Sequence, residues 1–206
     1  MKVGIVDYGM GNVYSVISAL EMIGADVIVC RTPESLKEVD RIILPGVGGF
    51  EDCMDTIKTK GFKEALNEEV IDLGKPIYGI CLGMQIMGRT STEFGEHKGL
   101  GWINGDVIKV KPNSKSLKIP HVGWNDINYK DGSFLFAGLP KSPDFYFVHS
   151  YYLHCDQTED VAATCVYGQV ITASIKKDNI FATQFHPEKS QDYGLKLLKN
   201  FLSWMP

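Results

Sequence analysis

Cys81 lies in the segment Gly79-Ile80-Cys81-Leu82-Gly83, which has the form G-x-C-x-G. A nucleophile between two such glycines is typical of a sharp strand-to-helix turn, because positions two before and two after it leave little room for a side chain. A helix that begins directly after the turn directs backbone N–H groups and its positive dipole end at the sulfur, which favours the thiolate. Taken alone, the pentapeptide fits a reactive thiol and a buried structural cysteine about equally well.

A base for this thiol is available in the segment Phe185-His186-Pro187-Glu188. Proline disfavours the helical conformation in the residue before it, so His186 is expected to be extended, and residues two apart in an extended chain project to the same side. Glu188 can then hold one imidazole nitrogen as a donor while the other accepts the thiol proton. We therefore predict Cys81 as nucleophile, His186 as acid and base, and Glu188 as orienting carboxylate, although a histidine and a glutamate at this spacing are more often an ordinary surface pair.

The glycine-rich segment Pro45-Gly46-Val47-Gly48-Gly49 follows an apolar run and is expected at the sheet edge where open α/β proteins bind ligands. Its glycines can turn backbone amides inward, and a tetrahedral intermediate needs such donors, each of which contributes about 2.7–4 kcal/mol. The amides of Val47 and Leu82 are candidates for an oxyanion hole, with Gly46 and Gly48 beside them. The alternative interpretation is that this glycine-rich segment is only a turn that links a strand to a helix. A phosphate loop is excluded because the G-x-x-x-x-G-K-[ST] pattern is absent.

The elements that must position these residues follow an α/β pattern in the first half of the chain. Short continuous apolar runs that alternate with helices are typical of a parallel sheet buried on both faces. An amphipathic helix is expected to begin after Asn12, at the N-cap position, and to end before Gly24. The predicted strands of this half are 3–7, 26–30, 41–44 and 76–80, and charged helical sequence continues from 50 to about 73.

The second half is richer in short β segments, which are expected to be antiparallel additions to the sheet. The pattern contains no internal repeat, low-complexity segment or linker, so we expect residues 1–206 to form one domain. The expected fold is an open, mostly parallel twisted sheet with helices on both faces. The predicted β segments are 102–103, 107–110, 145–148, 170–175 and 180–185, followed by a final helix with Tyr193, Leu197, Leu198, Phe201 and Leu202 on one face.

The composition of the 206 residues is that of an ordinary globular protein, with 44% hydrophobic and 22% charged residues. A formal charge of −4 provides no basic field for nucleic acid, which is therefore not expected as a partner. The N-terminal apolar run is shorter than a signal peptide's, and no run approaches the ~20 residues of a membrane span. The five cysteines are odd in number and form no C-x-x-C pair, so we expect no metal site and no redox dithiol. Reduced thiols are typical of the cytoplasm, so we expect a soluble, cytoplasmic protein.

The four cysteines other than Cys81 are predicted to lie in the core: Cys30, Cys53, Cys155 and Cys165.

The segments P-G-V-G, G-I-C-L-G-M-Q and F-H-P-E-K-S, in this order, resemble the class I glutamine amidotransferases, whose triad is Cys-His-Glu. The resemblance implies a thiol that attacks the side-chain amide of L-glutamine, releases ammonia and leaves a glutamyl thioester, which water hydrolyses to glutamate. It implies no cofactor. It also implies that Gln85 holds the substrate and that Glu93, at the end of the following helix, meets its α-amino group. The main chain of His149, Ser150 and Tyr151 is the implied clamp on the opposite side.

Three further segments, D-Y-G-M-G-N, I-P-H-V-G-W-N and Y-F-V-H-S-Y, are similar to those of the glutaminase subunits of imidazole glycerol phosphate synthases. This resemblance implies a heterodimer with a separate (β/α)₈-barrel cyclase, which receives ammonia through a tunnel. The cyclase makes imidazole glycerol phosphate and an aminoimidazole carboxamide ribotide in histidine biosynthesis. By the same resemblance, Asn12, Trp124, Tyr146 and Lys189 should lie near the interface.

Two alternatives stay open at the level of sequence. The chain could serve another ammonia-channelling synthase, such as the one that makes pyridoxal phosphate, or it could be a non-catalytic binding or regulatory subunit that retains the fold. His149 could also be mistaken for the base. We prefer His186 because it has a carboxylate two residues further on.

Overall fold

The computed structural model describes residues 1–114, 116–130 and 132–206. Within these residues, the larger sheet has nine strands in the order β2-β1-β3-β4-β13-β12-β11-β8-β9. The pairings from β2 to β13 are parallel, and those from β13 to β9 are antiparallel. The strands, in chain order, are β1 (Lys2–Val6), β2 (Asp26–Cys30), β3 (Arg41–Gly46), β4 (Ile77–Cys81), β8 (His121–Tyr129), β9 (Asp144–His149), β11 (Val161–Val166), β12 (Val170–Lys177) and β13 (Ile180–Thr183).

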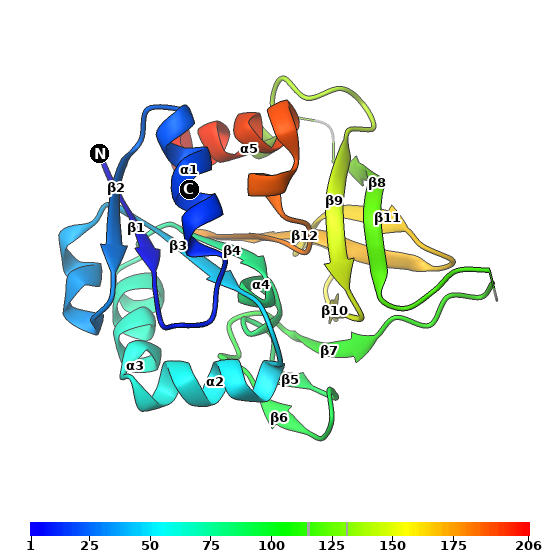
Figure 1. The fold of residues 1–206 in the computed structure, drawn as a ribbon, viewed down its shortest axis with the longest axis horizontal. Helices are drawn as coiled ribbons and strands as arrows, with labels where there is room; N and C mark the ends of the chain where they lie inside the picture. Colours follow the sequence, from blue (N-terminus) through cyan, green and yellow to red (C-terminus); the bar gives the residue numbers. More distant parts are fainter. Residues whose placement is uncertain (115, 131) are drawn as a thin grey trace.

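Helices cover both faces of the parallel strands (Figure 1), with α1 and α5 on one face and α2 and α3 on the other. A smaller sheet, ordered β10-β7-β5-β6, lies beyond α4 in the chain. Its strands are β5 (Thr90–Ser91), β6 (His97–Lys98), β7 (Gly105–Lys109) and β10 (Tyr151–Cys155). The helices are α1 (Val13–Met22), α2 (Phe50–Thr59), α3 (Phe62–Leu66), α4 (Leu82–Gln85) and α5 (Gln191–Ser203), with a π-helical turn η2 (Asn67–Asp72) and 3₁₀ turns η1 (Pro33–Glu38), η3 (Phe134–Phe136) and η4 (Pro187–Lys189).

The alternation of side chains along the central strands explains why both faces are buried. Ile43 on β3 and Tyr78 on β4 belong to the core layer beneath α1 and α5. Ile42 and Leu44, on either side of Ile43 in the chain, belong to the layer beneath α2 and α3. The prediction of an α/β fold with a doubly covered parallel sheet and antiparallel additions is therefore confirmed, although parallel and antiparallel pairings share the sheet evenly.

Most predicted elements are present, but three details were wrong. The segment 102–103 is not a strand, because the N–H groups of Trp102 and Ile103 both donate to the carbonyl oxygen of Met87 and not to a strand. The last strand ends at Thr183 and not at Phe185: the N–H of Gln184 still donates to the carbonyl oxygen of Ala173 on β12, but the N–H of His186 donates to that of Tyr146 on β9. On the final helix, four of the five predicted apolar residues are buried, whereas Tyr193 is exposed.

Asn12 occupies the N-cap position of α1, but its side chain makes no capping bond to the backbone. Its Oδ1 accepts a hydrogen bond of 2.9 Å from Ser15 Oγ instead. Gly24 follows the helix with φ of +76°, which is the left-handed conformation expected at a helix end. Among the described residues, no helix combines the length and the apolar character needed to cross a membrane.

The prediction that four cysteines lie in the core is confirmed. All four are buried, and each carries a free thiol. Burial raises the pKa of three of them to about 12: Cys53, Cys155 and Cys165. These thiols therefore stay protonated at pH 7 and are poor nucleophiles.

Candidate functional site

Cys81 is the last residue of β4 and directly precedes the short helix α4. Its φ of +55° and ψ of −108° are strained for a residue with a side chain. A Cβ atom at Gly83 would lie 1.9 Å from the carbonyl oxygen of Leu44, and one at Gly79 would lie 2.8 Å from that of Gly83. The backbone therefore requires both glycines for reasons of space, and the predicted sharp turn is confirmed.

His186 and Glu188 form a buried ion pair at the end of the sheet. His186 Nδ1 lies 2.8 Å from Glu188 Oε1, and the two side chains are only 2% and 1% exposed. The backbone of His186 is extended, as the following proline predicts, and η4 begins at Pro187. In the described part of the chain, His186 Nε2 makes no hydrogen bond, so this nitrogen can serve the thiol of Cys81.

The charges around His186 favour its imidazolium form. Burial lowers the pKa of His186, but the negative charges of the Cys81 thiolate and of Glu188 outweigh this effect and raise the pKa from 6.5 to about 10. An imidazolium at His186 therefore stabilises a thiolate at Cys81 once the thiol gives up its proton. Such a pair is the activated state of a cysteine nucleophile.

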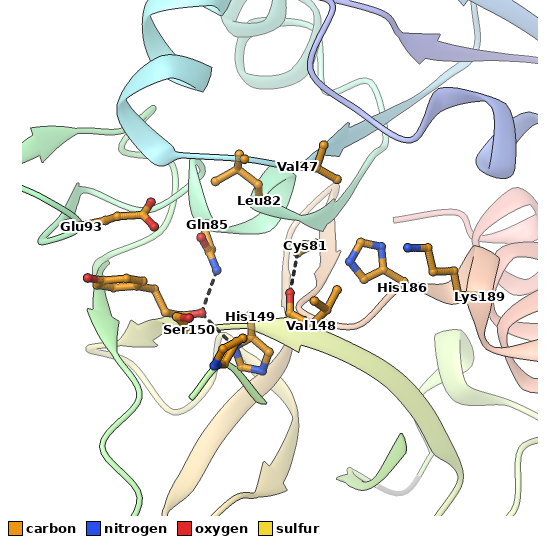
Figure 2. A pocket seen from close by; sticks show the side chains of 13 residues that line it. Val47, Cys81, Leu82, Gln85, Glu93, Val148, His149, Ser150, His186 and Lys189 are labelled. Atoms are coloured by element: carbon orange, nitrogen blue, oxygen red, sulfur yellow. Dashed lines mark hydrogen bonds between the residues drawn. The ribbon is translucent and has the colours of Figure 1, made fainter. Parts of the chain in front are cut away.

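A cavity of about 390 Å³ opens over Cys81. Figure 2 shows Cys81 in its middle, with Val47 and Leu82 on one side, Val148 on the other, and Glu93 across the cavity from His186 and Lys189. The predicted residues that line the cavity are Val47, Gly48, Cys81, Leu82, Gln85, Glu93, His149, Ser150, Tyr151, His186 and Lys189, and two residues that were not predicted, Pro120 and Val148, complete it.

The glycine-rich segment reaches the cavity because β3 pairs with β4 up to its last residue, which places Gly46 opposite Cys81. Val47, the next residue, is exposed and lines the cavity together with Leu82. Gly48 has φ of +99°, which a residue with a side chain rarely adopts. At Gly46, a Cβ atom would lie 2.8 Å from the hydroxyl oxygen of Tyr8. The segment is thus packed tightly at its start and open at Val47.

Gln85 projects from α4 and is fixed by two hydrogen bonds. Its Nε2 donates to the carbonyl oxygen of Tyr151 at 2.8 Å and to Gln184 Oε1 at 3.0 Å. Glu93 faces the same cavity, and its Oε2 accepts a hydrogen bond of 2.8 Å from the N–H of Phe50. The two residues predicted to hold the substrate are thus both present at one cavity.

The predicted place of Glu93 at the end of the helix that follows Cys81 was wrong. The helix α4 ends at Gln85, and Glu93 lies after the short strand β5. The helix does not continue, because the N–H of Arg89 donates to the carbonyl oxygen of Gly105 at 2.8 Å and not to that of Gln85, four residues before it. Strand β5 then carries Glu93 back to the cavity.

His149 is not placed as a base for Cys81. Its Nδ1 lies 2.9 Å from the Tyr151 carbonyl oxygen, and its Nε2 lies 3.0 Å from Nδ1 of His121. Burial lowers the pKa of His149 to about 3 and that of His121 to about 4. Both rings are therefore neutral at pH 7 and occupied with one another, which favours His186 as the base.

Two buried residues at the site were not predicted from the sequence. Gln184 is fully buried, and its Nε2 lies 3.6 Å from Cys81 Sγ. It stands two residues before His186, so the alternation of an extended chain was a signal that could have placed it beside the thiol. Tyr8 donates a hydrogen bond of 3.0 Å to the carbonyl oxygen of Pro45, and no local pattern indicated this contact.

Three of the four residues expected at a partner interface lie together. The rings of Trp124 and Tyr146 meet edge to face at 6.1 Å between their centroids. Lys189 Nζ lies 5.7 Å from the centroid of the Tyr146 ring. Trp124 is 46% exposed, which leaves a large aromatic surface there. Asn12 directly precedes α1.

The strained turn at Cys81, the buried pair of His186 and Glu188, and the α/β fold are the features expected of a class I glutamine amidotransferase. In agreement, the chain matches the family model of glutamine amidotransferase class-I over residues 4–204, and it belongs to this family.

Its curated relatives narrow the assignment to the HisH subunits of imidazole glycerol phosphate synthase. HisH 1 of Campylobacter jejuni (strain RM1221) is 48% identical over 200 residues, which are 97% of this chain and 98% of that protein. HisH of Rhizobium meliloti (strain 1021) is 44% identical over an alignment of 216 positions that covers 100% of both chains.

Solved structures share the fold at low sequence identity. The structure of PurLQS from Thermotoga maritima has a TM-score of 0.75 and 20% identity, and the alignment covers 98% of this chain and 97% of that one. A structure described as a glutamine amidotransferase has a TM-score of 0.75 and 19% identity, with 98% and 97% coverage.

Proposed function

We propose that this chain is the glutaminase subunit of an imidazole glycerol phosphate synthase and hydrolyses L-glutamine to glutamate and ammonia. The observation that carries the proposal is that Cys81, His186, Gln85 and Glu93 line one cavity. Glu188, the third residue of the triad, is hydrogen-bonded to His186 on the side away from the thiol. Residues 1–206 act as one glutaminase domain in this proposal.

The chemistry begins with transfer of the Cys81 thiol proton to His186 Nε2, while Glu188 holds Nδ1 as a donor. The thiolate attacks the carboxamide carbon of glutamine, and the N–H groups of Val47 and Leu82 stabilise the resulting oxyanion. The tetrahedral intermediate collapses as His186 returns its proton to the leaving amine, so ammonia departs and a glutamyl thioester remains. Water, deprotonated by His186, then attacks the thioester and releases glutamate with the thiol restored.

The same cavity contains groups that suit the ends of a glutamine molecule. Glu93 provides a carboxylate for the α-ammonium group, and Gln85 holds the substrate from the floor of the cavity. The main chain of His149, Ser150 and Tyr151 closes the opposite wall, where the neutral His149 ring fixes the Tyr151 carbonyl group. No metal or cofactor is part of this mechanism.

The ammonia is passed, in this proposal, to a separate (β/α)₈-barrel cyclase in a cytoplasmic heterodimer. The exposed Trp124, together with Tyr146 and Lys189, supports this docking face because a large aromatic side chain beside a cation is typical of interface anchors. Asn12 is the fourth proposed interface residue. The partner would use the ammonia to make imidazole glycerol phosphate and an aminoimidazole carboxamide ribotide in histidine biosynthesis.

The experiment that tests the proposal measures glutamate release by the purified chain, alone and with the cyclase and its nucleotide ligand. Release should be weak alone, should rise with the partner and ligand, and should be abolished by Cys81→Ala. Undiminished release by Cys81→Ala would overturn the proposal. Co-purification tests the partner separately, because recovery of a pyridoxal phosphate synthase barrel and not the cyclase would keep the chemistry but assign the chain to a different synthase.

A further inference from the structure

Gln184 connects the substrate-holding residue Gln85 with the sulfur of Cys81. It directly follows β13 and is fully buried, and its backbone N–H donates to the carbonyl oxygen of Ala173 on β12, which fixes its position beside the sheet. Its Oε1 accepts a hydrogen bond of 3.0 Å from Gln85 Nε2, and its Nε2 lies 3.6 Å from Cys81 Sγ. A fully buried amide that contacts the reacting atom needs an explanation beyond packing.

The orientation of this amide follows from the polarity of its hydrogen bonds. The carbonyl oxygen of Tyr151 can only accept, so Gln85 must present its NH₂ group to it. The same NH₂ group also faces Gln184, which must therefore present its oxygen to Gln85. The NH₂ group of Gln184 is then left on the side of Cys81 Sγ. The Tyr151 carbonyl oxygen therefore fixes the orientation of Gln85, and Gln85 in turn fixes that of Gln184. As a result, Cys81 Sγ faces an N–H donor.

We propose that Gln184 is a further catalytic residue, whose side-chain N–H donates a hydrogen bond to Cys81 Sγ and stabilises the thiolate. The proposal rests on the proposed function, because it concerns the same nucleophile. A hydrogen bond to a charged acceptor in a buried site is stronger than one between neutral groups. In the resting thiol, the S–H is directed at the Val148 carbonyl oxygen, 4.0 Å away, which leaves the lone pairs of the sulfur to Gln184.

Several titratable groups surround the sulfur and must stay constant in a test. His186 faces it with Glu188 behind, His149 lies on β9, and Tyr8 follows β1. Glu93 and Lys189 line the same cavity. All are unchanged when only position 184 is varied.

The test compares two variants of the full chain, Gln184→Met and Gln184→Glu. Methionine keeps the length of the side chain but removes both the donor to the sulfur and the acceptor for Gln85. Glutamate keeps an acceptor for Gln85 but places a carboxylate oxygen against the thiolate. A role limited to holding Gln85 would therefore tolerate Gln184→Glu and not Gln184→Met, whereas a role in thiolate stabilisation makes Gln184→Glu the more harmful change.

The measurement is the rate of alkylation of Cys81 by iodoacetamide as a function of pH, read from the mass of the Cys81 peptide. We expect the midpoint of the profile to rise by about one pH unit or more in Gln184→Met and further in Gln184→Glu. With the cyclase present, kcat for glutamine should fall by about tenfold or more in Gln184→Met. Midpoints equal to that of the unaltered chain, or a shift in Gln184→Met alone, would overturn the proposal.

Alkylation needs no turnover of glutamine, so its result is independent of the proposed function. A shifted midpoint in a chain without glutaminase activity would support the role of Gln184 at the thiol while refuting the assigned substrate. If Gln184→Glu fails to fold, as circular dichroism would show, the midpoint of Gln184→Met still decides, because an unchanged value excludes the hydrogen bond.

Discussion

The carbonyl oxygen of Leu44 occupies the space that a side chain at Gly83 would need, since a Cβ atom there would lie only 1.9 Å away. Leu44 lies on β3 and Gly83 on α4, so this close approach joins the strand that leads to Val47 with the helix that follows Cys81. This contact holds Cys81 and the candidate oxyanion segment at one edge of the sheet.

The first prediction concerns this contact. Gly83→Ala should lower the free energy of unfolding by about 3 kcal/mol or more, because the added methyl group overlaps backbone that cannot move without breaking the sheet. Urea unfolding followed by circular dichroism measures the loss. Glutaminase activity should fall with it, because the turn that presents Cys81 must widen.

Gly24→Ala is the matched control for this change. Gly24 has φ of +76° but nothing within 4 Å of an added Cβ atom, so the substitution should cost only the conformational strain of about 1–2 kcal/mol. A loss in Gly83→Ala no larger than that in Gly24→Ala would show that space at the elbow is not limiting.

The second prediction concerns the hydroxyl group of Tyr8. This group donates to the Pro45 carbonyl oxygen at 3.0 Å and lies 3.3 Å from Cys53 Sγ. Tyr8→Phe should lower stability by about 1–3 kcal/mol, because a buried carbonyl group loses its donor. It should also lower kcat several-fold, because the segment that carries Val47 loses an anchor. Steady-state kinetics with the cyclase and urea unfolding measure the two effects.

Tyr129→Phe provides a control with the same chemistry away from the cavity. The Tyr129 hydroxyl group donates to the Pro140 carbonyl oxygen at 3.0 Å. This variant should lose stability but keep kcat. Equal kcat in the Tyr8 and Tyr129 variants would contradict a role for Tyr8 in positioning the segment.

The third prediction concerns the charge of His186, whose pKa is raised from 6.5 to about 10 by the Cys81 thiolate and Glu188 against the effect of burial. The stability that comes from this raised pKa is present in full below pH 6.5 and is lost as the pH rises through about 10. Glu188→Gln removes one of the two negative charges that raise this pKa, so the free energy of unfolding of this variant should fall less steeply than that of the unaltered chain as the pH rises. Urea unfolding at several pH values across this range tests it, and parallel curves would argue against the ion pair.

The fourth prediction concerns the pair of buried histidines. Burial lowers the pKa of His121 from 6.5 to about 4 and that of His149 to about 3. The folded chain therefore binds fewer protons than the unfolded chain below pH 6.5, so the free energy of unfolding should fall as the pH decreases from 6.5 toward 4. His121→Gln should make this fall shallower in urea unfolding at several pH values. The same slope in both chains would mean that His121 takes up its proton while folded.

The sequence predicted those parts of the fold and site that are encoded locally. The runs of β1, β3 and β4 are continuous, mostly apolar and almost entirely buried, so their positions follow from the pattern itself. His186 and Glu188 meet because a spacing of two residues and the proline between them set their geometry. The contacts of Gln184 with Cys81 and of Tyr8 with Pro45 join residues 103 and 37 positions apart. Such contacts depend on the order of strands in the sheet, which local patterns do not determine.

The central claim is that Cys81 attacks the side-chain amide of glutamine. The most direct measurement incubates the chain and the cyclase with a glutamine analogue that carries an electrophilic diazoketone in place of the amide, and locates the adduct by peptide mass spectrometry. We predict one adduct per chain, on Cys81, with labelling suppressed by excess glutamine. An adduct on any other residue, or none with the cyclase present, would contradict the claim and favour a non-catalytic binding subunit.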